Sequence, residues 1–176
     1  MPELETPRLR LRALGPEDAA GVLQVLGDDE VTRYHSMPTL TTLEEAHAAL
    51  AQLQRRYQAE ESLRWAIEVA GRPGLIGTVG LLHVSAEHRR GELGYELARA
   101  WWGQGVMTEA ARAVVTYAFE RLGLHRIEAG VLVGNDRSVR VLQKLGFHEE
   151  GTLRAHLQLE GQFQDVRWFS LLPTDV

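Results

Sequence analysis

The sequence predicts a mixed α/β protein, a sheet with helices on both faces, formed by a single domain over residues 1–176. Three observations support this prediction. Strand-like alternation and helical spacing of apolar residues follow one another along the chain. The middle of the chain carries a hairpin signal, whereas the later part alternates strands with helices. No linker rich in Pro, Gly or Ser divides the 176 residues, a length that suits one domain.

The first part of the chain is expected to form a strand and two helices. Residues 8–14 alternate polar and apolar side chains, as a half-buried strand does. The run Gly15-Pro16-Glu17-Asp18 then starts a helix that ends near Gly27. A second helix is expected over residues 42–58, because apolar residues recur there at helical spacing.

The rest of the chain is expected to supply most of the sheet. Two strands of a hairpin are separated by turn residues, and a third strand leads into a long helix. These segments are residues 63–69, 75–82, 91–98 and about 105–122. A strand, a helix and two final strands complete the chain, with Gly146 at the position of a helix C-cap. The strand and helix of that last group are residues 126–133 and 136–145.

Composition excludes several classes of protein. Lys and Arg total 19 against 24 Asp and Glu, a net charge of -5 that disfavours a nucleic-acid partner. The absence of cysteine excludes disulfides, thiolate zinc sites and cysteine nucleophiles. No apolar run is long enough to cross a bilayer, and residues 1–5 lack a signal-peptide pattern, so a cytoplasmic protein without a membrane partner is expected. The histidines show no metal-ligand spacing, and no metal site is expected.

The segment from Leu97 to Thr108 connects a strand to the long helix. Gly103 and Gly105 fall where the first helical turn leaves N–H groups without partners, a site that suits a phosphate or diphosphate. The dinucleotide fingerprint is incomplete, since Thr108 stands where its third glycine would be. A tight connection in which glycine only relieves strain explains the loop equally well. Glu109 agrees with that second interpretation, because its carboxylate already complements the helix dipole.

Further motifs surround this loop in a fixed order. They are Gly94-Tyr95-Glu96-Leu97, Trp102-Gly103-Gln104-Gly105, Glu109-Ala110, Leu122-Gly123-Leu124-His125-Arg126-Ile127-Glu128, Asn135-Asp136-Arg137-Ser138 and Val141-Leu142-Gln143-Lys144-Leu145-Gly146-Phe147. Through them, the chain from about Gly91 to Leu153 resembles the GNAT acetyltransferases, specifically the RimJ/RimL-like branch that acetylates ribosomal-protein N-termini. The resemblance implies a mostly antiparallel sheet of six to seven strands, splayed at the cofactor strand, and acetyl-CoA as co-substrate.

The resemblance also implies which residues contact acetyl-CoA. The diphosphate would rest on the N–H groups of Gly103, Gln104, Gly105, Val106 and Met107. The pantetheine arm would pair with the backbone at Glu96, Leu97 and Ala98, and the N–H near Leu97 would stabilise the oxyanion. Asn135 and Ser138 suit helix capping from their spacing alone. The resemblance adds contact of Asn135 with the arm and proton donation from Ser138 to the departing thiolate.

The implied reaction is direct attack of an amine on the thioester, which requires a base or a water chain to take a proton. Glu92 and Glu96 share one strand face, and either could serve if burial raises its pKa, although solvated carboxylates are equally expected there. His156 is a further candidate. Glutamates that relatives use as bases correspond here to Gly130 and Leu157, so both are absent.

The expected acceptor is a primary amine, and the resemblance suggests the α-amine of a protein N-terminus, such as that of a ribosomal protein. Two alternatives remain open: a small-molecule amine (a polyamine or an aminoglycoside), or a non-catalytic module that binds acyl-CoA. Residues 34–40 and the last two strands are expected to choose the acceptor. The resemblance is compatible with a homodimer.

Overall fold

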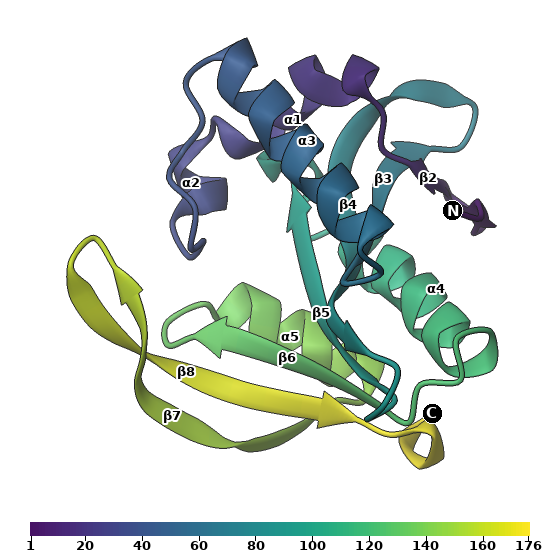
Figure 1. Cartoon of the computed structure of the whole chain (residues 1–176), viewed down its shortest axis with the longest axis vertical. Helices are drawn as coiled ribbons and strands as arrows, with labels where there is room; N and C mark the ends of the chain where they lie inside the picture. The colour runs from purple at the N-terminus through teal and green to yellow at the C-terminus, as the bar shows by residue number, and fades with distance from the viewer.

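The computed structural model describes residues 1–176 and is built on one open sheet of eight strands (Figure 1). The strand order is β1-β2-β3-β4-β5-β6-β8-β7, and only β5 and β6 run parallel. The strands are β1 (Leu4–Glu5), β2 (Leu9–Ala13), β3 (Leu63–Val69), β4 (Arg72–Ser85), β5 (Arg90–Leu97), β6 (Arg126–Leu132), β7 (His148–Leu159) and β8 (Gln162–Leu171).

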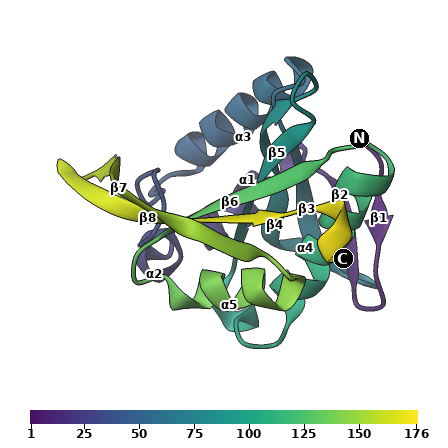
Figure 2. The same ribbon diagram turned by 90° about the horizontal axis from the view of Figure 1, so that it is seen from below.

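Five α-helices and three short 3₁₀ segments accompany the sheet, and the helices cover both faces (Figure 2). The α-helices are α1 (Ala19–Leu26), α2 (Asp29–Thr32), α3 (Leu43–Gln58), α4 (Val106–Glu120) and α5 (Asp136–Leu145). Helices α1 and α3 pack on one face, and α4 and α5 pack on the other, so each face has its own apolar cluster. None of the helices is long and apolar enough to span a membrane.

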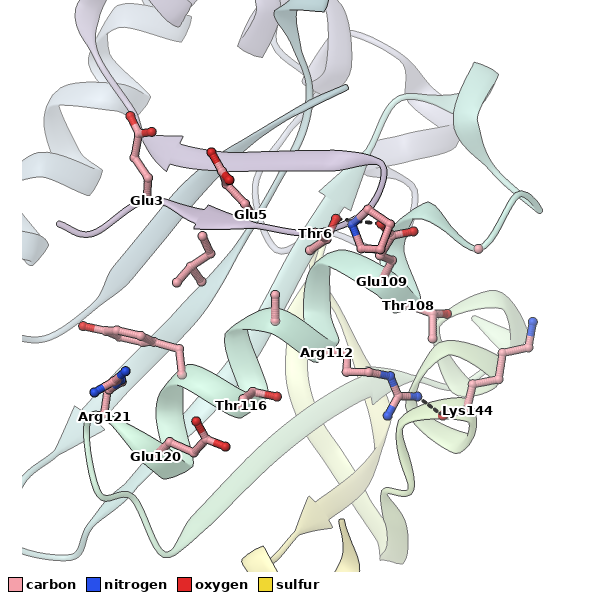
Figure 3. A pocket seen from close by; sticks show the side chains of 15 residues that line it. Glu3, Glu5, Thr6, Thr108, Glu109, Arg112, Thr116, Glu120, Arg121 and Lys144 are labelled. Carbon is pink, nitrogen blue, oxygen red and sulfur yellow. Dashed lines mark hydrogen bonds between the residues drawn. The ribbon is translucent and has the colours of Figure 1, made fainter. Parts of the chain in front are cut away.

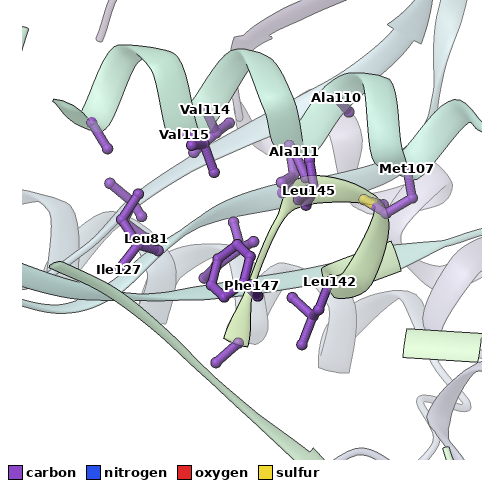
Figure 4. Close-up of a cluster of buried hydrophobic side chains, with 14 of the residues drawn as sticks. Leu81, Met107, Ala110, Ala111, Val114, Val115, Ile127, Leu142, Leu145 and Phe147 are labelled. Atoms are coloured by element: carbon purple, nitrogen blue, oxygen red, sulfur yellow. The ribbon is translucent and has the colours of Figure 1, made fainter. Parts of the chain in front are cut away.

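The larger cluster holds 25 buried residues between α4, α5 and the sheet (Figure 4). Strand alternation decides which face each side chain joins. Trp65 and Ile67 enter the α4–α5 cluster, whereas Ala66 between them enters the α1–α3 cluster. Because Ala66 lies opposite Thr78, and Thr78 lies opposite Glu96, the Glu96 side chain is on the α1–α3 face.

The expected mixed, mostly antiparallel sheet with helices on both faces is confirmed, but it has eight strands rather than six or seven. The additional strand is β1, whose two residues are too few for an alternating pattern. Helix α2 was likewise not expected from the sequence, since four residues carry no helical periodicity. Helix α5 has the predicted bounds, with Asn135 as N-cap and Gly146 at φ 92° as C-cap.

Strand β7 forms one edge of the sheet and is paired only with β8, in a hairpin that projects from the body of the molecule (Figure 2). Its pairing register shifts twice, between Glu149 and Gly151 and between Leu153 and Leu157. At the second shift Ala155 has a φ of 50°, and its N–H donates to Asp165 Oδ1 at 2.8 Å. The edge strand is therefore bent and partly detached from its neighbour.

Candidate active site

The two parallel strands at the middle of the sheet separate shortly after they begin. Strands β5 and β6 are paired at Arg90/Arg126, Gly91/Ile127 and Glu92/Glu128, and no pairing follows although β5 continues to Leu97. A V-shaped opening therefore interrupts the sheet, as the resemblance implied.

The β4–β5 ladder determines which main-chain groups of β5 face this opening. The N–H of Ala98 donates to Ile76 O at 2.8 Å, so the neighbouring pair Gly77/Leu97 is of the non-hydrogen-bonded type. The N–H and C=O of Leu97 therefore point toward β6, and by alternation so do those of Tyr95. The Leu97 carbonyl accepts from Trp102 Nε1 at 2.7 Å, which leaves its N–H directed into the opening.

Ala98 differs from the sequence-based expectation. Its N–H is bonded to Ile76 O, and its carbonyl accepts from the N–H of Trp101 at 2.9 Å. Both main-chain groups of Ala98 are thus occupied, and the N–H of Glu96 points toward β4 by the same alternation. Of the three residues expected to pair with a pantetheine arm, only Leu97 presents its backbone to the opening. Tyr95, which was not among the three, does so as well.

The loop between β5 and α4 presents a row of free amides. None of the six consecutive N–H groups from Gly103 to Thr108 donates a hydrogen bond to another group of the protein. Gly103 and Gly105 both have φ of 75°, and a Cβ at Gly103 would meet nothing within 4 Å. These left-handed residues turn the chain so that the amides and the N-terminus of α4 point outward together, which is the geometry of an anion site.

Glu109 is not a free negative charge at the loop, because its carboxylate is paired with Arg8 and Thr6. It accepts from Thr6 Oγ1 at 2.6 Å (Figure 3). It also accepts from Arg8 N–H at 3.0 Å and from Arg8 Nε at 2.6 Å. Burial would raise the pKa of Glu109, but these hydrogen bonds outweigh it and lower the pKa. Arg8 also donates to Gln104 O at 3.1 Å, so the pair fixes the loop to the start of the chain.

A groove of about 730 Å³ extends from this loop along α4 and β1 (Figure 3). It is lined by charges of both signs, among them Glu3, Glu120, Arg112 and Lys144. It includes Gly105 but neither Glu96 nor Ser138, so it is separate from the opening in the sheet.

Met107 and the residues at the start of α5 meet their expectations in part. The Met107 side chain is buried against the α4–α5 core, as the expected main-chain role requires (Figure 4). Asn135 caps α5, since its Oδ1 accepts from Ser138 N–H at 3.3 Å, while its Nδ2 has no protein acceptor. The capping interpretation is confirmed, and the side-chain amide stays free to donate.

Ser138 is joined to a residue that sequence reasoning did not single out. The Tyr95 hydroxyl lies 2.8 Å from Ser138 Oγ and so bridges β5 and α5 across the opening. Burial raises the pKa of Tyr95 to about 12, partly offset by the hydrogen bond with Ser138. The phenol therefore stays protonated and can donate a hydrogen bond to Ser138 Oγ. The sequence could have indicated this contact, because Tyr95 occupies a core-facing strand position, where its hydroxyl needs a hydrogen-bond partner.

Glu96 is buried in a cluster that no local sequence pattern indicates. Its carboxylate accepts from Arg64, from Thr78 Oγ1 at 2.5 Å, and lies 2.6 Å from His35 Nε2. The condition under which Glu96 could act as a base, a pKa raised by burial, is not met. Burial alone would raise the pKa, but the Arg64 charge, helped by His35 and Thr78, holds the pKa of Glu96 well below its usual range. Glu96 is a permanent carboxylate rather than a proton acceptor.

Glu92 and His156, the other candidates for the base, lie on the same face of the sheet as Glu96, as does Glu128. Glu92 accepts from His83 Nδ1 at 3.0 Å. The His156 ring is exposed and lies edge-on to Trp168, with centroids 5.9 Å apart. Trp168 also explains Gly130, since a Cβ there would come within 2.9 Å of its ring. Glu128 forms ion pairs with arginines at 2.9 and 3.1 Å.

Comparison with known proteins decides the family. The model of the acetyltransferase (GNAT) domain matches residues 8–148. The uncharacterized N-acetyltransferase YoaA of Bacillus subtilis is 37% identical over 171 residues, 97% of each chain. The chain belongs to the GNAT acetyltransferases. GNAT acetyltransferases use acetyl-CoA and act on amines.

Two further matches to this GNAT domain differ in their acceptors. The [ribosomal protein uS5]-alanine N-acetyltransferase of Escherichia coli is 38% identical over 73 residues, 42% of this chain and 38% of that protein. The structure of a spermidine N-acetyltransferase from Vibrio cholerae, in complex with CoA and spermine, superposes with a TM-score of 0.83 at 25% identity, covering 97% of this chain and 98% of the other. The family assignment therefore leaves the acceptor of this GNAT domain undecided.

Proposed function

We propose that this GNAT domain transfers the acetyl group of acetyl-CoA to the α-amine of a protein N-terminus. The proposed binding of acetyl-CoA rests on the row of unpaired amides from Gly103 to Thr108. This row follows the end of β5, one of the two strands that border the opening. Main-chain donors at a helix N-terminus are suited to a diphosphate, and the opening is suited to an extended arm that pairs like a strand.

The residues around the opening divide the chemistry among them. The amides of the loop hold the diphosphate, and Asn135 Nδ2 and the Tyr95 backbone contact the arm. The Leu97 N–H stabilises the oxygen that gains charge as the amine nitrogen bonds to the acetyl carbon. The carbon–sulfur bond then breaks, and the Ser138 hydroxyl, held in place by its hydrogen bond with Tyr95, protonates the thiolate. The amine must give up a proton to a base on the acceptor side.

An N-terminal peptide is favoured by two observations. The uS5-alanine N-acetyltransferase is 38% identical to this chain over 73 residues. The region of the β7–β8 hairpin also exposes large apolar side chains that a polypeptide could cover: Val133, Leu153 and Phe163 are 56%, 40% and 66% exposed.

A polyamine is the second candidate. The similarity to the spermidine N-acetyltransferase extends over nearly the whole chain. In addition, a surface groove beside α1 and α2 is lined by Asp28, Asp29 and Glu30. Arg99 also lines it and pairs with Asp28 at 3.0 Å, so the two other carboxylates carry the negative charge that would attract a polycation.

Two measurements test the proposal. Calorimetry with acetyl-CoA should show stoichiometric binding, and thiol release should then be followed with N-terminal peptides, polyamines and aminoglycosides. Turnover highest with peptides supports the proposal, whereas turnover confined to polyamines supports the second candidate. Tight acetyl-CoA binding without acceptor-dependent thiol release would indicate a non-catalytic module, and no binding would reject the assignment of the cofactor site.

A further inference from the structure

The loop between α2 and α3 is fixed across the opening in the sheet. The Tyr34 hydroxyl donates to Gly134 O, after β6, at 3.1 Å, and the N–H of His35 donates to Thr32 O at 2.7 Å. With the loop held by these two hydrogen bonds, the His35 ring contacts Glu96 on β5. The loop thus brings an imidazole to the α1–α3 face of the sheet, beside the residue that precedes Leu97.

The surroundings of Glu96 determine where the proton of His35 resides. Both Arg64 and Thr78 donate to Glu96 Oε2, and Oε1 lies 2.6 Å from His35 Nε2. An ionised carboxylate can only accept, so Nε2 must carry the hydrogen. In the neutral imidazole the remaining nitrogen, Nδ1, then holds a lone pair. It is buried, and it is the one buried side-chain polar atom in the protein without a hydrogen-bond partner.

We propose that His35 Nδ1 accepts the proton that the acceptor amine loses as it attacks the thioester, with Glu96 as the positioning residue that fixes the tautomer. This inference rests on the proposed acetyl transfer. The nitrogen–carbon bond forms, the proton passes to Nδ1 directly or through one water, and the thiolate is protonated from Ser138. The imidazolium afterwards returns its proton to solvent, and Ser138 regains from solvent the proton that it gave to the thiolate.

The positions of the two proton-handling groups agree with this assignment. His35 and Glu96 are on the α1–α3 face, whereas Tyr95, which contacts Ser138, belongs to the α4–α5 face. An amine that enters from one face meets His35, and the thiol leaves on the other. Leu97, whose N–H is directed into the opening, directly follows Glu96 in the chain.

The two other carboxylates of the acceptor face are already paired, and His156, the remaining candidate, is exposed and lies edge-on to the Trp168 ring. Glu92 is bonded to His83, and Glu128 to Arg90 and Arg126. The charged group that faces the His35–Glu96 pair is Arg64 from β3, and the neutral hydroxyl of Thr78 from β4 donates to the same carboxylate.

Three variants test the inference: His35→Gln, Glu96→Gln, and His47→Gln as a control on the exposed surface of α3. In Glu96→Gln the amide oxygen must face Arg64, because a guanidinium only donates. The amide NH₂ then faces His35 Nε2, which must become an acceptor, and the hydrogen moves to Nδ1. This change removes the free lone pair while it retains the shape of the cluster.

With whichever amine is turned over, kcat should fall roughly 10²–10⁴-fold in His35→Gln and in Glu96→Gln, the usual range for a general base. The KM for acetyl-CoA and the His47→Gln rates should not change. Nitrogen NMR of the wild-type imidazole should show His35 protonated at Nε2, and at Nδ1 in Glu96→Gln. If His35 were purely structural, the tautomer would still change in Glu96→Gln, but kcat would not fall selectively in either variant.

Two results would overturn the inference: an Nδ1-protonated His35 in the neutral wild type, or a kcat for His35→Gln equal to that of the control. In the second case the enzyme still turns over, so the proposed function stands. If no amine is acetylated by the wild type, the proposed function fails and the inference fails with it.

Discussion

Replacement of Arg64 by methionine should destabilise the protein strongly at neutral pH. The Arg64 and Glu96 side chains are 8% and 9% exposed, so the substitution leaves a buried carboxylate without its cation. Removing one partner of such a pair costs about 3–5 kcal/mol. For a domain of this size that loss lowers Tm by roughly 6–20 °C.

The pH dependence of the Arg64→Met effect follows from the direction of the shift. The pKa of Glu96 is lowered in the folded protein, so its stabilising contribution is complete above the unfolded pKa and is lost as pH falls through the folded pKa. The stability deficit of Arg64→Met should therefore be largest near pH 7 and narrow below about pH 5, where a carboxyl deprived of Arg64 is protonated.

Urea unfolding from pH 4 to pH 8 measures this deficit. Arg55→Met, at an exposed position of α3, is the matched control and should stay within about 0.5 kcal/mol of the wild type. The double variant Arg64→Met/Glu96→Gln should recover much of the loss, because no buried charge remains. A deficit below about 1 kcal/mol, or one equal at pH 4 and pH 7, would refute the role of a buried ion pair.

Three further variants test the cofactor side and the packing. Ser138→Ala should slow thiol release and leave acetyl-CoA affinity in calorimetry largely unchanged; unchanged turnover would reject its role as proton donor. Gly105→Glu should weaken acetyl-CoA binding through charge at the phosphate site, whereas Gly71→Glu, in a turn with nearly the same φ (73° against 75°), should impose similar strain without loss of binding. Gly130→Ala should lower Tm, since its Cβ would lie 2.9 Å from the Trp168 ring; an unchanged Tm would show that the ring moves freely.

Features that depend on neighbours in sequence could be predicted. The glycine loop, the Asn135 cap and Gly146 all act through residues a few positions away, and the structure places them as expected. Strand alternation also placed Glu92 and Glu96 on one face. The unpaired state of the loop amides followed from the lack of partners at a helix N-terminus.

Features that depend on strand order could not be predicted. The charge state of Glu96 is set by Arg64, 32 residues away in the chain, and by His35, 61 residues away. Burial was the only effect visible in the sequence, and it shifts the pKa in the opposite direction. The hydrogen bond from the Ala98 N–H to Ile76 O likewise depends on the register of β4 against β5.

The two ends of the sheet have a consequence for behaviour in concentrated solution. Unpaired strand edges can recruit other chains and template aggregation. Here β1 offers two residues, too few to hold an incoming strand, and β7 is bent by its bulges, with the Ala155 donor already taken by Asp165. Neither margin presents a long, straight row of free donors and acceptors, so an eight-stranded open sheet can persist without self-polymerisation.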